Sequence, residues 1–218
     1  MYLIVHGDSD IVFDGGKISA GGVGIAVEEE GFRIGTAKAP VVAKRSGSVN
    51  NFGVVGEHAV VNNVFHTNEK KRPKIRSDVA MFFSEACSSS TVFVPEGEKI
   101  DEIHIKGSAK VHVKSGAAIA PKVRLEVSGD GSIILDGVDF AAVGAYVSGS
   151  GSIEGRLGAA ASNATFLVSG SGRIRGFRVS KKAVASVFGD GAVDVDVSAG
   201  ATRATSAVGP GRITFNEY

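Results

Sequence analysis

From residue 103 onward, the chain repeats one phrase six times: a short alternation of apolar and polar residues, a turn built on glycine, and a second alternation. The leading glycine of the turn returns every 19 to 22 residues. Repetition at a nearly constant period indicates stacked copies of one structural unit. The copies are IHIKGSAKVHV (103–113), LEVSGDGSIIL (125–135), AYVSGSGSIEG (145–155), FLVSGSGRIRG (166–176), ASVFGDGAVDV (185–195) and TSAVGPGRITF (205–215).

The turns contain two glycines separated by one residue, except in the first copy, where Ala109 replaces the second glycine. Glycine adopts positive φ without a steric cost, so the G-x-G pattern predicts sharp corners between strands. We expect the following residues to be structural turn glycines: Gly107, Gly129, Gly131, Gly149, Gly151, Gly170, Gly172, Gly189, Gly191, Gly209 and Gly211.

The segments beside each turn alternate β-branched and polar residues, as in Val193, Val195 and Val197, which indicates half-buried strands. One unit of about 20 residues is too small to bury its apolar face, whereas stacked units share a continuous core. The pattern predicts an all-β, right-handed β-solenoid, roughly 25–30 Å long for six coils. An antiparallel meander of hairpins is the alternative. The linkers 155–165 and 179–185 lack a sharp hairpin signal, which favours the solenoid.

The phrase V-S-G-S-G-x-I and the final GPGRITF resemble the auto-transporter adhesin head GIN domain family (DUF2807) over about residues 99–218. The resemblance implies a right-handed β-helix that is adhesin-like and commonly secreted or lipid-anchored. After the turn, that family usually has Asp, where this chain has Ser132, Ser152, Arg173, Ala192 and Arg212.

Residues 1–97 form a less regular, mostly β region in this interpretation, with 98–218 as the solenoid domain. The opening IVHGDSDIVF echoes the repeat, with Gly7 at the corner, and predicts either a divergent coil or a hairpin. Apolar residues at helical spacing predict one short helix at about 77–87, which would cover the first coil. Pro95 and Gly97 mark the expected boundary.

The composition argues against several classes of protein. The chain has 24 basic and 23 acidic residues, so its net charge gives no overall electrostatic attraction for nucleic acid. Nucleic acid is therefore not expected as a partner. Cys87 is the single cysteine, so the fold has no internal disulfide. The sequence contains no run of 18 apolar residues and no basic segment typical of a signal peptide. A cytoplasmic or particle-associated protein is expected, or an extracellular one if the family resemblance holds.

Candidate sites are few. The basic run 68–76 offers a possible polyanion patch at Lys70, Lys71, Arg72, Lys74 and Arg76. Acidic residues at 8, 10 and 14 do not follow a calcium-loop pattern, and those at 194 and 196 are expected on the outer strand face. The five histidines lack zinc-ligand spacing, and those at 104 and 112 are expected to face solvent. We therefore predict no catalytic, cofactor or metal site.

Two functions are compatible with this pattern. The first is a non-enzymatic structural or adhesin-like protein that presents a β-helical surface, forms a homo-oligomer (a trimer or dimer), and contacts glycans or a cell or particle surface. The second is a carbohydrate-active β-helix enzyme, a polysaccharide lyase or hydrolase. Such an enzyme needs clustered charged residues and walls around a cleft, and short coils provide no long loops for them.

Overall fold

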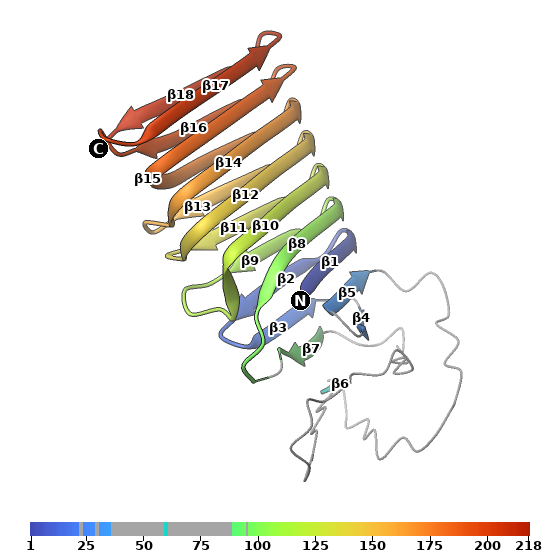
Figure 1. Cartoon of the computed structure of the whole chain (residues 1–218). Coiled ribbons are helices and arrows are strands. Elements are labelled where there is room, and N and C mark those ends of the chain that lie inside the picture. Colours follow the sequence, from blue (N-terminus) through green and yellow to red (C-terminus); the bar gives the residue numbers. More distant parts are fainter. Residues whose placement is uncertain (22–23, 29–30, 36–58, 61–88, 95) are drawn as a thin grey trace.

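The computed structural model describes residues 1–21, 24–28, 31–35, 59–60, 89–94 and 96–218. Every regular element in this part of the chain is a β-strand. Most of the strands stack as the parallel coils of a β-solenoid (Figure 1). The predicted all-β solenoid is therefore confirmed.

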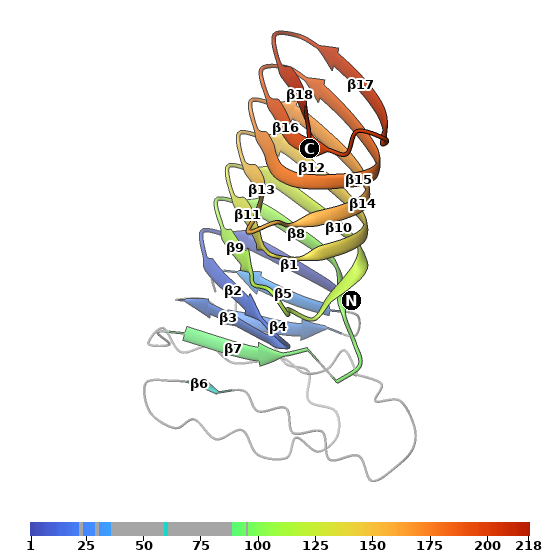
Figure 2. The same cartoon turned by 90° about the vertical axis from the view of Figure 1, so that its left-hand side faces the viewer.

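Each coil has two arms joined by a glycine corner, and the arms stack into two parallel arrays (Figure 2). Among the described residues the two arrays belong to one continuous 18-stranded sheet, and we call them the first and second sheets. The first sheet contains β1 (Tyr2–Gly7), β8 (Ile100–Gly107), β10 (Ile119–Gly129), β12 (Asp139–Gly149), β14 (Ala160–Gly170), the later part of β15 (Arg173–Phe188) and β17 (Thr202–Val208). The second sheet contains β2 (Asp10–Asp14), β9 (Lys110–Val113), β11 (Ser132–Asp136), β13 (Ser152–Arg156), the start of β15, β16 (Ala192–Val197) and β18 (Arg212–Glu217).

The register of the coils excludes the antiparallel meander. Strands one repeat apart pair in parallel, so that Val127 lies beside Val147 and Ile133 beside Ile153. Equivalent residues of the repeat therefore form columns along the stack.

The first residues of the chain form a coil of their own, which decides between the two interpretations of this segment. Strand β1 pairs in parallel with β8, and β2 pairs in parallel with β9. Gly7 lies beside Gly107, so the corner is shared with the repeats. The division of the chain into an N-terminal region, 1–97, and a solenoid domain, 98–218, stays a prediction.

Further strands lie against both arms of this first coil. Strand β3 (Lys17–Gly21) pairs antiparallel with β2 and with β7 (Ser89–Phe93), and β6 (Ala59–Val60) pairs with β7. Strand β5 (Gly31–Gly35) pairs with β1 and with β4 (Gly24–Glu28). These strands cover hydrogen-bonding edges that would otherwise be open. The helix expected at about 77–87 lies outside the described residues.

Columns of inward-facing residues fill the core. In the first sheet, one column runs from Val5 through the β-branched residues of successive coils to Val187, and its members are almost fully buried. In a neighbouring column, Phe166 lies between Ala145 and Ala185. A large side chain between two small ones fills the space without overpacking, as close packing requires.

The glycine corners are needed for both conformation and space. Gly149 has a φ of 123°, and a Cβ atom there would lie 2.6 Å from the carbonyl oxygen of Gly129 in the preceding coil. Gly151 has no positive φ, but a Cβ atom on it would lie 2.5 Å from the carbonyl oxygen of Gly131. The coils therefore stack at the spacing of a parallel sheet only because both positions lack a side chain.

The last coil is more polar than the others on its inward side. Arg203 and Thr205 of β17 occupy the column positions that Ala183 and Ala185 fill one coil earlier. Arg203 donates a hydrogen bond to Glu217 at 3.0 Å. The last described coil therefore has polar groups at positions where the preceding coil has alanine.

Candidate functional site

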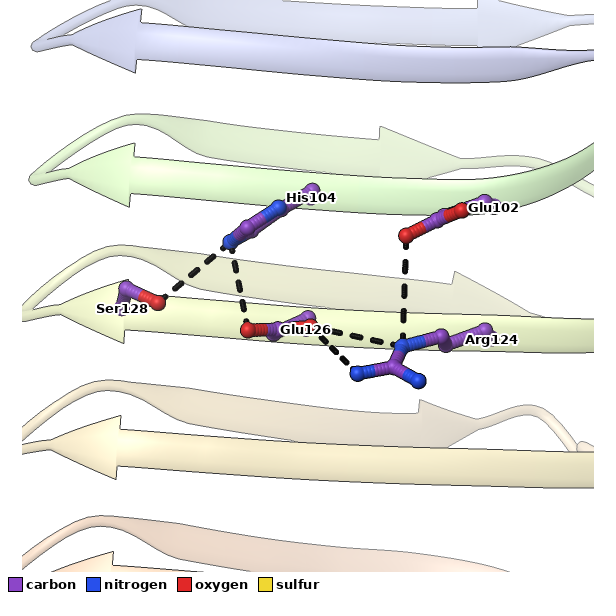
Figure 3. Close-up of polar contacts among 5 residues, drawn as sticks. All are labelled: Glu102, His104, Arg124, Glu126 and Ser128. Carbon is purple, nitrogen blue, oxygen red and sulfur yellow. Dashed lines mark hydrogen bonds and ion pairs between the residues drawn. The ribbon is translucent and has the colours of Figure 1, made fainter.

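A cluster of charged residues lies on the outer face of the first sheet, across strands β8 and β10 (Figure 3). We call it the Glu102 cluster, and it consists of Glu102, His104, Arg124, Glu126 and Ser128. Alternation along each strand points these residues away from the core. The register places Glu102 beside Arg124 and His104 beside Glu126.

The members of the Glu102 cluster contact one another directly. His104 Nε2 lies 3.3 Å from Glu126 Oε1 and 3.4 Å from Ser128 Oγ. Arg124 Nη2 donates to Glu126 Oε2 at 2.9 Å, and its Nε lies 3.9 Å from Glu102 Oε1 (Figure 3). The side chains of His104 and Glu126 are mostly buried, at 16% and 23% exposure, whereas Arg124 is 54% exposed.

The electrostatics of the cluster follow from these contacts. The hydrogen bond to Glu126 raises the pKa of Arg124, while burial acts in the opposite direction and the charges of Glu126, Tyr146 and Glu102 add to the increase. A guanidinium held between two carboxylates neutralises one of them. Glu102, Arg124 and Glu126 together therefore carry an excess of one formal negative charge.

An aromatic ring extends the cluster toward the next coil. Arg124 Cζ lies 4.8 Å from the ring centroid of Tyr146 on β12, within the range of a cation–π contact. The ring lies over Gly144, where a Cβ atom would be 2.9 Å from Tyr146 Cε2. Glycine at this position therefore allows the ring to lie along the sheet surface.

A shallow, open groove of about 510 Å³ adjoins this ring. Its lining combines two acidic and two basic side chains with apolar and hydroxyl groups, so its formal charge is balanced. The lining residues are Asp101, Glu102, Lys122, Val123, Arg124, Ala142, Val143, Gly144, Tyr146 and Thr165.

The outer face of the second sheet carries a different set of ion pairs. His112 Nε2 contacts Asp136 Oδ2 across the neighbouring coils. Glu154 accepts a hydrogen bond from Arg156 at 2.8 Å and contacts Arg175 at 3.2 Å. The hydrogen bond from Arg156 lowers the pKa of Glu154, burial opposes this, and Arg175 lowers it further. The His112–Asp136 and Glu154–Arg175 pairs link successive coils, whereas Glu154 and Arg156 lie on the same strand, β13.

The residues singled out in the sequence are placed as follows. The first glycines of the corners all have positive φ, and the second glycines pack against the preceding coil. Asp194 and Asp196 face outward, and Asn216 Nδ2 donates to both. The possible polyanion patch at 70–76 lies outside the described residues.

The expectation that His104 and His112 face solvent is only partly met, since each pairs with a carboxylate of the next coil. The Glu102 cluster was missed in the sequence because Glu126 lies a whole coil away from His104 along the chain. The nearly constant spacing of the corner glycines was the signal that could have placed His104 and Glu126 side by side on neighbouring coils.

The described residues therefore form a β-solenoid with an open groove on the outer face of its first sheet. None of the described residues forms a helix that could cross a bilayer. The model of the family "Putative auto-transporter adhesin, head GIN domain" (DUF2807) matches residues 36–216, and the chain belongs to this family. The match begins well before residue 99, where the resemblance seen in the sequence starts. No curated protein and no solved structure matches the chain.

Proposed function

We propose that this chain is a non-enzymatic, adhesin-like binding module that recognises a neutral glycan at the groove beside Tyr146. The observation that carries the proposal is the combination of one aromatic ring with hydrogen-bonding side chains of balanced charge in a shallow, open groove. Membership of the adhesin head family supports the same class of function.

The chemistry of the groove suits a sugar. The aliphatic face of a pyranose ring packs on an aromatic side chain, and its hydroxyls need donors and acceptors around the rim. Tyr146 supplies the ring, while Lys122, Thr165 and Glu102 supply polar groups of both kinds. An open groove leaves the rest of a long glycan in solvent, which suits adhesion to a surface.

The alternative, a carbohydrate-active enzyme, finds less support. A glycosidase needs one carboxyl group that holds a proton and another that is ionised. In the Glu102 cluster, Glu126 accepts a charge-assisted hydrogen bond from Arg124 at 2.9 Å. Glu102 also contacts Arg124, so neither carboxylate has the apolar surroundings of a general acid.

A glycan array with the wild-type chain, followed by calorimetry on the best neutral ligand, tests the proposal. We expect Tyr146→Ala to weaken binding at least about tenfold, since an aromatic anchor commonly contributes about 1–2 kcal/mol or more. Tyr218→Ala is the matched control, because Tyr218 likewise has an arginine beside its ring, with Arg178 Cζ 5.8 Å from the ring centroid, but lies outside this groove. Equal affinity of Tyr146→Ala and wild type would overturn the proposal, as would turnover of the glycan.

We also propose that the chain forms a homo-oligomer, a dimer or trimer, through the C-terminal half of the first sheet. Phe188 and Val208 are neighbours in register there and are 45% and 60% exposed. Light scattering is expected to give the mass of two or three chains, and Phe188→Ser to shift it toward one. A monomeric wild type would contradict this proposal and leave the glycan site untouched.

A further inference from the structure

We propose that Glu102, His104 and Glu126 bind one divalent transition-metal ion of the zinc class. The ligand atoms that these three side chains offer all lie within 4.8 Å of one another. This proposal does not depend on the glycan site: Glu102 belongs to both, but His104 and Glu126 do not line the groove.

The spacing of the donors is close to that of a coordination sphere. Zinc binds imidazole nitrogen and carboxylate oxygen at about 2.0–2.2 Å, so adjacent ligand atoms in a tetrahedral site are roughly 3.4 Å apart. His104 Nε2 and Glu126 Oε1 are 3.3 Å apart already. The whole group lies within 4.8 Å, so side-chain adjustment is needed to complete the set, and Glu102 is 43% exposed and has room to move.

The backbone holds the three ligands in place. Glu102 and His104 are two residues apart on β8, so both point to the same side of the sheet. Glu126 is the direct neighbour of His104 on β10. Ligands on paired strands are positioned more rigidly than ligands on loops, and ordering them costs little additional entropy.

The donor types select the class of metal. An imidazole nitrogen with two carboxylates suits zinc, cobalt, nickel or copper, whereas calcium and magnesium prefer oxygen ligands alone. Three protein ligands leave a fourth position for water or for an external ligand. Glu102 also lines the groove, so a bound ion would lie beside it.

Arg124 is an internal competitor for the metal. Its guanidinium contacts both glutamates, at 2.9 Å for Glu126 and 3.9 Å for Glu102. It therefore pairs with the same carboxylates that would coordinate a metal. Its side chain is 54% exposed and can move into solvent when a divalent ion binds. Removing this cation should therefore strengthen metal binding, whereas a cluster that only holds the coils together would lose stability and gain no affinity.

Calorimetric titration of the full chain with Zn²⁺ tests the proposal, and the visible absorption of bound Co²⁺ reports the coordination geometry. We expect one ion per chain. Loss of a partner outside the ligand shell commonly costs about 10–100-fold in metal affinity, so loss of the ligand in His104→Ala is expected to cost at least about 100-fold. Arg124→Ala is expected to bind Zn²⁺ at least about tenfold more tightly, because a positive charge that repels the metal is removed.

The matched control is His112→Ala. His112 forms the same kind of histidine–carboxylate pair between neighbouring coils, with Asp136, but is not part of a three-residue ligand group in the described residues. We expect wild-type affinity from this variant, and circular dichroism of each variant verifies the fold. Absence of Zn²⁺ binding to the wild type, or equal loss in His104→Ala and His112→Ala, would overturn the site. Weaker binding in Arg124→Ala would overturn the competition.

Discussion

Glycine can be required at a position for two reasons: a positive φ, or a lack of space for a Cβ atom. Four glycines of the solenoid allow these two reasons to be tested separately. Gly200 has no positive φ, and a Cβ atom on it would have no other atom within 4 Å, so its replacement by alanine meets no obstacle. Gly158 has a φ of 83° and open space. Gly151 has an ordinary φ and severe crowding, and Gly149 has both problems. Substitution of each glycine by alanine therefore gives a two-by-two test.

The structure sets the expected loss of unfolding free energy for each variant. Gly200→Ala should be neutral or stabilising by about 0.4–1 kcal/mol, because alanine restricts the unfolded chain. Gly158→Ala should cost about 1–2 kcal/mol for the left-handed conformation. Gly151→Ala should cost about 1–3 kcal/mol for overpacking. Gly149→Ala combines a clash with a φ of 123° and should cost about 2–6 kcal/mol.

Urea unfolding followed by circular dichroism measures these differences, and thermal melts provide a second readout. For a chain of this length, a loss of about 4 kcal/mol in Gly149→Ala corresponds to about 8–16 °C in Tm. The decisive comparison is between Gly149→Ala and Gly200→Ala, both substitutions of one hydrogen by one methyl group. If their stabilities agree within about 0.5 kcal/mol, coil stacking does not require glycine at the corner and the reasoning is refuted.

Three other predictions concern individual side chains. Leu157 is 82% exposed with a φ of 51°, so Leu157→Asn should raise stability by about 0.5–1 kcal/mol in urea unfolding; a destabilised variant would contradict this. Phe166→Ala should lower the unfolding free energy by about 3–5 kcal/mol through a cavity, and a loss below about 1 kcal/mol would show that the coil collapses onto it. Because the folded pKa of Glu154 is lowered from its ordinary value near 4.5, its stabilisation is complete above that value and is lost as the pH falls through the folded pKa. Glu154→Gln should therefore flatten the acid side of the stability–pH curve, and parallel curves for both proteins would exclude the ion pair as the cause.

The repeat made the solenoid predictable because its physical requirements are local. A corner that needs positive φ, as at Gly129, and a strand with alternating valines can both be recognised within a short window of sequence. The parallel pairing then follows from stacking identical corners. Even the divergent opening coil could be suspected from Gly7, although its pairing with Gly107 required the structure.

The candidate site could not be predicted in the same way, because its contacts join different coils. His104 and Glu126 become neighbours only through the register of β8 and β10. Tyr146 reaches Arg124 because Gly144 leaves room for its ring, which is a property of side chains on neighbouring coils. Residue types alone therefore suggested solvated charges, whereas the register assembles them into a cluster with an adjoining groove.

Two hollows of the described surface lie where the repeat is irregular. Regular stacking gives flat faces, but β10 has more residues between Ile119 and Arg124 than β8 has opposite them, and this register shift borders the groove beside Tyr146. A second, smaller hollow of about 230 Å³ is lined by Ala161 and Ser162, at the register shift between β14 and β15. Bulges bend a strand and redirect side chains, and they often lie next to functional sites. In this solenoid, the regular stack of corners fixes the core, while changes in coil length between corners shape the surface on which a ligand could be recognised.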